Sequence, residues 1–366
     1  MRARPTLAAA LLLTLPLPGW SVRAQIPAAT APTATAASAL PRVLLVATGG
    51  TISNKEGGRL TAEELVTLMP NVGRYAQPEF EQFSNLASSA LTLDQWVALA
   101  KRVNQAFKDD PGIAGIVITS GTDTLEELAY FLDLTVRSAK PVVVVGSMRN
   151  PSTLGYEGAA NLLEGFRVAA DRAAVGRGVM VVLNDEINAA REVTKTDALR
   201  LNTFQSRGYG VLGVVDSDRV VFYRRVEKKH TADSEFDIAS VTTLPRVDVI
   251  LTYQGAPGDL IKAAVDAGAK GIVVAGAGAG ATSGTQGEGI NYALGKGVFV
   301  VSTTRAGSGR IAARQRPPAT SGAAPNPRER FISGEDLAPV KARLLLMLAL
   351  TKTQSGADIQ RMFVEY

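Results

Sequence analysis

Two threonine-rich turns, each directly after an apolar run, hold the residues of this sequence that are best suited to chemistry. The first turn, TGGT at 48–51, closes the segment 43–52, and the second, TSGTDT at 119–124, closes the segment 116–124. Short β-branched runs of this kind predict buried parallel strands, and open α/β sheets bind ligands at the carboxyl ends of such strands. We therefore expect hydroxyls and backbone N–H groups from both turns to converge at one edge of a sheet.

The residue counts restrict the nucleophile of any covalent chemistry to a hydroxyl group. The chain has no Cys and one His. A Thr or Ser hydroxyl is a weak nucleophile, so it needs a nearby base that takes its proton. His230 lies in a charged segment, where we expect a solvated side chain. The base is then a lysine or a carboxylate, and Lys195 and Asp123 are the candidates.

Each of these features also has a structural interpretation when it is taken alone. A Thr after a strand commonly caps a helix, the pair Gly49-Gly50 suits a tight turn, and an isolated lysine such as Lys195 is most often solvated. Glu126 and Glu127 fall in the first turn of a predicted helix, where the helix dipole favours acids, so we interpret both as structural. The glycines of 276–280 lack the lysine and the spacing of a phosphate loop, and they favour close packing.

The start of the chain has the pattern of an export signal. Basic residues precede an apolar stretch at 7–17, and small residues surround Ala24. We expect a signal peptide at 1–24 and a periplasmic or secreted protein, because the apolar stretch is too short for a membrane span. The Ala/Thr/Pro tract at 25–41 predicts a disordered spacer.

Charge and composition exclude several classes of partner. The net charge is +5, and removal of the three arginines of 1–24 leaves +2, which gives no electrostatic basis for nucleic-acid binding. Without Cys and with one His, soft metal ligands are almost lacking, so we expect no metal site. Hydrophobic residues make up 46% and charged residues 20% of the chain, as in soluble globular proteins.

The rhythm of strand, turn and helix from residue 42 onward predicts two α/β domains. We expect a large, doubly wound, mainly parallel N-terminal domain at 42–225, a linker at 226–245, and a smaller α/β domain at 246–366. The predicted strands lie at 142–145, 179–183, 247–251, 272–275 and 298–302, in addition to the two that precede the threonine turns. The predicted helices begin at the capping box of residues 92–95 and otherwise cover 124–136, 156–173, 339–351 and 357–363.

Taken together, the motifs resemble those of the exported type II bacterial L-asparaginases and glutaminase-asparaginases. The resemblance covers nearly all of residues 42–366, and several independent motifs make it specific. The matching strings are ATGGTI at 47–52, GTDT at 121–124, ELAYFLDLTV at 127–136, KPVVVVGSMR at 140–149, VTKT at 193–196, GYGVLG at 208–213 and KARLLLMLALT at 341–351.

The resemblance implies catalytic roles for four residues. Thr51 matches the nucleophilic threonine that attacks the side-chain amide and forms an acyl-enzyme. Thr122 matches the second catalytic threonine, and Lys195 is placed to control its proton and the attacking water. Asp123 matches the carboxylate that binds the substrate α-ammonium group.

The resemblance also implies the substrate contacts. Ser88 matches the serine that binds the α-carboxylate, and Ser89 follows it. Backbone N–H groups near Gly50 and Thr122 are the expected oxyanion donors. Ser147 falls where the backbone meets the substrate amide.

The sequence departs from the family pattern at the first turn. The segment 53–61, which corresponds to a mobile lid, is short and contains no tyrosine. The glutamate that pairs with that tyrosine has no clear counterpart, since Glu329 is offset, and Gly255 stands where a neighbouring subunit normally supplies an asparagine. Either another tyrosine replaces the missing one, with Tyr156 as the first candidate, or the group of Thr122, Lys195 and Asp123 activates the nucleophile. Packing of Tyr156 on the sheet at the start of a helix is the alternative.

The resemblance implies an L-asparagine amidohydrolase that releases L-aspartate and ammonia, needs no cofactor or metal, and forms a homotetramer as a dimer of dimers. Two alternatives remain open: a glutaminase-asparaginase of broad specificity, and a periplasmic amino-acid-binding protein with weakened turnover. We expect asparagine to be preferred over glutamine, although one methylene is worth only about 1–3 kcal/mol of discrimination.

Overall fold

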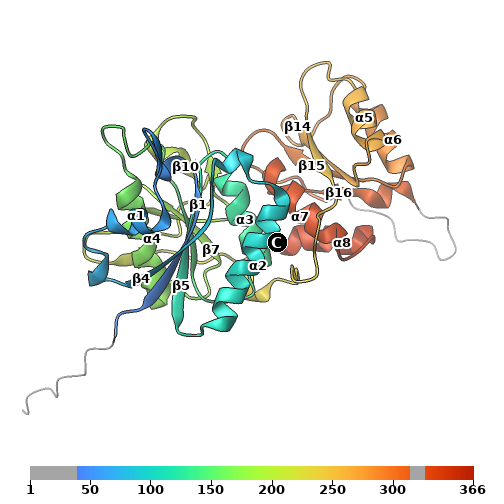
Figure 1. Cartoon of the computed structure of the whole chain (residues 1–366). Helices are drawn as coiled ribbons and strands as arrows, with labels where there is room; N and C mark the ends of the chain where they lie inside the picture. Colours follow the sequence, from blue (N-terminus) through green and yellow to red (C-terminus); the bar gives the residue numbers. More distant parts are fainter. Residues whose placement is uncertain (1–38, 314–325) are drawn as a thin grey trace, which may run out of the picture. The chain divides into compact units, whose positions relative to one another are not determined.

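The computed structural model describes residues 39–313 and 326–366 (Figure 1). The expected signal peptide, 1–24, lies outside these residues, as does most of the expected spacer, 25–41. No helix in the described ranges is long and apolar enough to cross a membrane.

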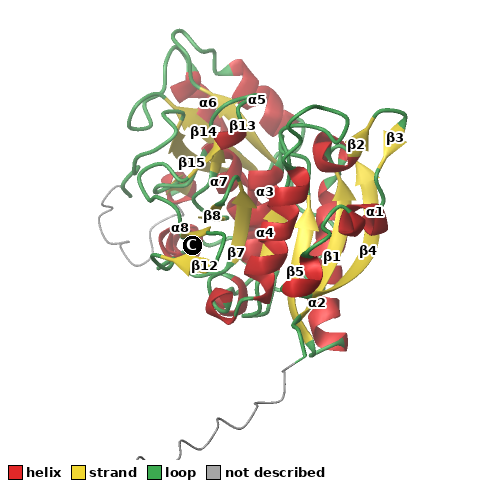
Figure 2. Ribbon diagram, turned by 90° about the vertical axis from the view of Figure 1, so that its left-hand side faces the viewer, coloured by secondary structure: helices red, strands yellow, loops and turns green. Residues whose placement is uncertain are grey.

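The N-terminal domain is built on an eight-stranded, mainly parallel sheet in the order β12-β11-β8-β7-β6-β5-β1-β4 (Figure 2). Five neighbouring strands run parallel, in the order β4-β1-β5-β6-β7. β8, β11 and β12 extend the sheet with antiparallel pairs. The strands are β1 (Arg42–Gly49), β4 (Gln77–Leu86), β5 (Ile113–Thr119), β6 (Val142–Val145), β7 (Val179–Leu183), β8 (Glu186–Ala189), β11 (Gly213–Val215) and β12 (Val220–Phe222).

Helices cover both faces of this sheet, as a doubly wound fold requires. Alternate residues of β1 face opposite cores: Val43 and Leu45 pack with α1 (Ala62–Thr67) and α4 (Gly158–Ala170), and Leu44 packs with the other two helices. Those two are α2 (Leu93–Asp109) and α3 (Leu125–Thr135). The chain passes from β1 to β4 on one side and then to β5 on the other, which makes β1 the topological switch point where such sheets bind ligands.

Local sequence accounts for most of these elements. The four valines of β6 and the five residues of β7 are all buried, and both strands have the predicted limits. Helix α2 begins at the predicted capping box, in which Thr92 accepts from the Gln95 N–H and the Gln95 side chain accepts from the Thr92 N–H.

Strand β4 and helix α4 are among the elements that differ from the prediction. Strand β4 was not expected, because as an edge strand it is only partly buried and carries charged residues rather than an apolar run. Helix α4 is shorter than the expected 156–173, since it begins at Gly158 and a separate 3-10 turn, Arg172–Ala174, follows it.

The C-terminal domain has a four-stranded parallel sheet in the order β13-β14-β15-β16. Helices α5 (Asp259–Asp266) and α6 (Gln286–Gly295) pack on one face, and α7 (Pro339–Leu350) and α8 (Gly356–Glu365) pack on the other. The strands are β13 (Val247–Leu251), β14 (Gly271–Gly276), β15 (Phe299–Thr304) and β16 (Phe331–Ser333).

The segment expected as a linker, 226–245, has little regular structure but is well packed. Phe236 and Ile238 belong to the same hydrophobic core as α3 and α7. His230 is half-buried, with Nδ1 3.0 Å from the Thr231 hydroxyl, rather than solvated as expected.

Candidate active site

The two threonine turns lie side by side at the carboxyl ends of adjacent strands. β1 pairs with β5 up to Ala47 and Thr119. One residue further, Thr48 N donates to Thr119 Oγ1 at 3.1 Å, and Thr48 Oγ1 donates to Thr119 O at 2.6 Å. These bonds fix the start of both turns, so the convergence expected from the sequence is found.

Glycine allows the two turns to touch. Gly50 has φ 89°, and a Cβ at this position would lie 2.2 Å from the backbone N of Gly121. A Cβ on Gly121 would in turn lie 2.8 Å from Ser88 Oγ. At position 50, only glycine tolerates both the positive φ and the close approach to Gly121. The turn after β1, the turn after β5 and the segment after β4 therefore meet at one point.

Lys195 connects the two polar residues of the second turn. Its Nζ donates to Thr122 Oγ1 at 3.0 Å and to Asp123 Oδ1 at 3.1 Å. Thr122 is 5% exposed, whereas the Asp123 side chain is 70% exposed. Because the ammonium group donates to the Thr122 oxygen, the hydroxyl proton of Thr122 points away from Lys195. The Asp123 carboxylate is accessible to a ligand.

Glu126 holds Lys195 in place. Lys195 lies on the short strand β9 (Thr194–Lys195), which pairs with β10 (Phe204–Gln205). The Lys195 N–H donates to Glu126 Oε1 at 3.1 Å, and the Thr194 hydroxyl donates to Glu126 Oε2. Glu126 is in the first turn of α3, as predicted, but its carboxylate also orients the strand of the candidate catalytic lysine.

The buried Lys341 lies behind this network, and the sequence interpretation missed it. Its Nζ donates to Ala190 O at 2.9 Å and to Arg191 O at 3.1 Å, and it lies 3.9 Å from the Glu126 carboxylate. Burial lowers the pKa of Lys341 to about 8, although the Glu126 charge opposes the shift. A helix of the C-terminal domain thus fixes the turn that leads to Lys195. The sequence signal is a lysine near the start of a helix that is apolar apart from this residue and Arg343.

The two serines after β4 differ in their surroundings. Ser88 is 3% exposed, and within the described part of the chain its Oγ has no hydrogen-bond partner. A buried hydroxyl without a partner costs free energy, so it suits a ligand oxygen. Ser89 is exposed.

Two residues expected near the substrate have hydrogen-bond partners within the fold. The Gly50 N–H donates to Leu86 O at 2.8 Å, so it is engaged within the fold instead of facing a ligand as an oxyanion donor. The Ser147 hydroxyl donates to Arg149 O at 2.6 Å and is buried.

Tyr156 does reach the first turn, but as a donor to the backbone. Its hydroxyl donates to Ile52 O at 2.8 Å, one residue beyond Thr51. Burial raises the pKa of Tyr156 further above its usual value, which opposes a role as a base. Tyr156 also packs against the core of α1 and α4, so the packing interpretation holds as well.

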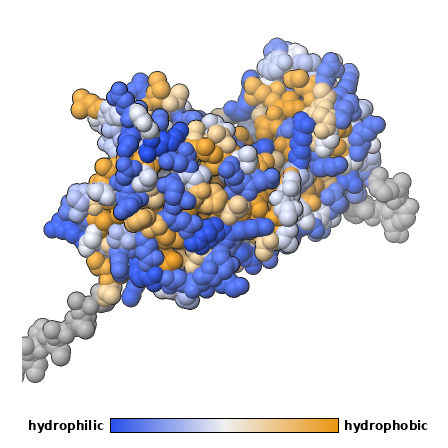
Figure 3. All heavy atoms as spheres, in the orientation of Figure 1, coloured by the Kyte–Doolittle hydropathy of each residue, from blue (hydrophilic) through white to orange (hydrophobic). Residues whose placement is uncertain are grey.

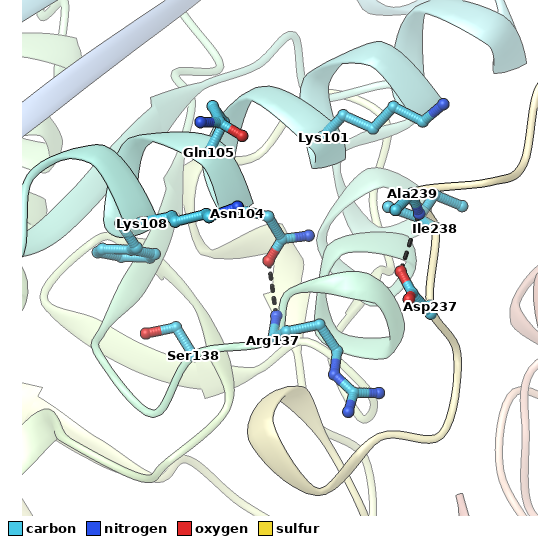
Figure 4. Close-up of a pocket in the computed structure, with 10 residues that line it drawn as sticks. Lys101, Asn104, Gln105, Lys108, Arg137, Ser138, Asp237, Ile238 and Ala239 are labelled. Carbon is cyan, nitrogen blue, oxygen red and sulfur yellow. Dashed lines mark hydrogen bonds between the residues drawn. The ribbon is translucent and has the colours of Figure 1, made fainter.

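A separate cavity of about 610 Å³ lies away from these turns (Figure 4). It is lined by α2 and by the segment around Asp237, and it contains none of the predicted site residues. Within 39–313 and 326–366, no group of three or more His, Cys, Asp or Glu is arranged to hold a metal ion.

The fold is that of a two-domain α/β protein, and its candidate reactive groups are threonine hydroxyls at a sheet switch point. The family model described as "Asparaginase, N-terminal" matches residues 42–228, and "Glutaminase/Asparaginase C-terminal domain" matches residues 246–363. The chain therefore belongs to the asparaginase family of hydrolases, which act on amide C–N bonds.

Curated relatives and a solved structure also show similarity to this family. The chain is 41% identical to L-asparaginase 2 of Bacillus subtilis, over 89% of this chain and 87% of that protein. It is 39% identical to L-asparaginase 2 of Escherichia coli (90% and 95%) and 35% identical to the glutaminase-asparaginase of Pseudomonas fluorescens (89% and 91%). The crystal structure of a probable cytoplasmic L-asparaginase from Campylobacter jejuni matches with a TM-score of 0.80 at 39% identity, covering 90% of this chain and 100% of that one.

Proposed function

We propose that the protein hydrolyses L-asparagine to L-aspartate and ammonia through an acyl-enzyme on Thr51. The observation that supports this most is the contact between the two turns: Gly50, which precedes Thr51, lies against Gly121, which precedes Thr122, and Lys195 bonds to Thr122 and Asp123. Family membership and the names of the relatives support the reaction class.

The proposed reaction has two halves. Thr51 Oγ attacks the side-chain amide carbon, the C–N bond breaks, and the hydroxyl proton reaches the departing nitrogen to give ammonia. Water then attacks the ester carbon, and aspartate leaves as Thr51 regains its proton. Thr122 and Lys195 serve as the proton path, because the Lys195 ammonium donates to Thr122 Oγ1 and leaves the threonine proton directed elsewhere.

The α-amino acid part of the substrate has two proposed anchors. Asp123 binds the α-ammonium group with its exposed carboxylate, and Ser88 donates its unpartnered hydroxyl to the α-carboxylate. We assign weaker contacts with the substrate, through the backbone, to the segments of Gly50, Ser89 and Ser147.

Location and assembly are further parts of the proposal. The signal-like start supports export, and a relative from Haemophilus influenzae with 36% identity is named a probable periplasmic L-asparaginase. For the homotetramer, support comes from apolar side chains exposed on the C-terminal domain, where Figure 3 shows orange surface. Val249, Leu251, Tyr253 and Leu260 are each at least 36% exposed, and a second copy would cover them.

The test is steady-state release of ammonia and formation of aspartate or glutamate by the purified protein with L-asparagine and with L-glutamine. We expect turnover of L-asparagine with a higher kcat/KM than that of L-glutamine. Similar kcat/KM values for the two amides would instead identify a glutaminase-asparaginase. Tight aspartate binding without ammonia release would identify a binding protein and refute the proposal.

A further inference from the structure

The first turn is held by two long side chains from different loops, one on each side of Thr51. Arg59 Nη1 donates to Gly50 O at 3.2 Å, and the Tyr156 hydroxyl donates to Ile52 O at 2.8 Å. The Gly50 carbonyl also accepts from the N–H and the hydroxyl of Ser53, at 3.2 and 3.1 Å. The backbone on both sides of the proposed nucleophile is therefore pinned.

Arg59 comes from a short hairpin that is itself anchored. The hairpin consists of β2 (Asn54–Lys55) and β3 (Gly58–Arg59). At its tip the Glu56 N–H donates to Ser152 Oγ at 2.8 Å. The Leu60 N–H closes the segment on Ser53 O at 2.7 Å. These bonds fix the point from which the guanidinium reaches back to the turn.

The charge of Arg59 is not neutralised by a neighbour. Within the described residues, none of the ion pairs includes Arg59, and its one hydrogen bond goes to a backbone carbonyl. Lys55, on the same hairpin, is by contrast paired with Glu64. A guanidinium offers five N–H groups, so most of those of Arg59 remain available beside the nucleophile. A half-buried cation at this place stabilises the negative charge that develops as a hydroxyl attacks an amide.

Resting on the proposed function, we propose that Arg59 is a positioning residue for catalysis. It holds the Gly50 carbonyl and places a positive charge next to Thr51, in a chain whose segment 53–61 contains no tyrosine. Tyr156 supplies the second hold without a charge. The short hairpin thus orients the turn that carries Thr51 and places a positive charge near it.

The test compares kcat and KM for L-asparagine among R59Q, R59K, Y156F and the matched control K55Q, over a range of NaCl concentrations. In R59Q we expect kcat to fall by about 10- to 100-fold with KM within about threefold, and R59K to recover a large part of the loss. K55Q should match the wild type. Added salt should lower kcat of the wild type and Y156F but not of R59Q, because salt screens a partly exposed charge.

Equal kcat in R59Q and the wild type would overturn the proposal, and so would an equal loss in K55Q, which would show a general need for the hairpin. Wild-type inactivity on L-asparagine would refute the proposed function instead. In that event amide hydrogen exchange at residues 51–53 still tests the hold on the turn: faster exchange in R59Q than in K55Q supports it, and equal exchange contradicts it.

Discussion

Lys195 Nζ lies 3.0 Å from Thr122 Oγ1, although the two residues are 73 positions apart in the chain. The contact forms because Thr122 lies in the loop between β5 and α3 and Lys195 lies on the short strand β9 beyond β8. Glu126 at the start of α3 bonds to that strand. A lysine amine and a threonine hydroxyl at this distance form a unit that can move a proton to and from a reacting group.

Loss of the Lys195 amine should disable this unit. We expect K195M to lower kcat for L-asparagine by about 10²- to 10⁴-fold, the range typical of general acid–base groups, with a smaller change in KM. Ammonia release under saturating substrate measures the effect, and a circular dichroism spectrum like that of the wild type controls for folding. Near-normal kcat would remove Lys195 from the mechanism.

Ser88 should act on binding rather than on the chemical step. A hydrogen bond to a charged group contributes about 1.5–3 kcal/mol, so S88A should raise the KM for L-asparagine by about 10- to 100-fold. Ser89 is exposed, which makes S89A the matched control with a change of less than about threefold. The proposed role of Ser88 fails if the two variants have the same KM.

Lys341 should stabilise the site from the C-terminal domain. K341M leaves the Ala190 and Arg191 carbonyls without their buried donor, and we expect the free energy of unfolding to fall by about 3–5 kcal/mol. In K352M the lost bond is exposed, between Nζ and Glu235 O, so the loss should stay below about 1 kcal/mol. Urea denaturation of both variants checks this, and equal stability of the two contradicts it.

Asp133 should make stability depend on pH. Burial raises its pKa to about 6, although nearby His230 and the Val179 N–H lower it, whereas an unfolded aspartate titrates near 3.9. Between these values the folded protein binds more protons than the unfolded chain, so this group makes stability fall as the pH rises from about 4 to 6.

D133N removes that titration, so its stability relative to the wild type should increase over the same pH range. Urea unfolding of both proteins at pH 4.5 and pH 7 measures the difference. A constant difference between the two proteins at both pH values would show that Asp133 does not titrate in this window.

Local sequence predicted the elements that are buried on both faces. β6 and β7 have the expected limits because runs of β-branched residues in a buried parallel sheet leave few alternatives. The edge strand β13 also has the expected limits, although it is only partly buried. β4 was missed because an edge strand with one solvated side needs no apolar run. The hairpin β2–β3 was missed because two-residue strands carry no periodicity.

The candidate site was predictable where motif and fold coincide, and not where tertiary contacts decide. Thr51 and Thr122 follow strands that the sequence predicts, and Lys195 belongs to the motif VTKT at 193–196. Two sets of bonds join segments far apart in sequence, so no local sequence pattern predicts them: the bond between Glu126 and Lys195, and the bonds from Lys341 to the turn at Ala190. The bond from the Gly50 N–H to Leu86 O was not predicted, because it depends on β4, which the sequence did not predict.

The proposed reaction requires Thr51 as the nucleophile, and ammonia release from L-asparagine by T51A tests this most directly. We expect T51A to lose at least about 10³-fold in kcat, since removal of a nucleophile leaves only binding and oxyanion stabilisation, while T51S keeps measurable turnover. Acid quenching during turnover should trap an aspartyl ester on Thr51 in the wild type. Ammonia release by T51A at the wild-type rate would show that Thr51 is not the nucleophile.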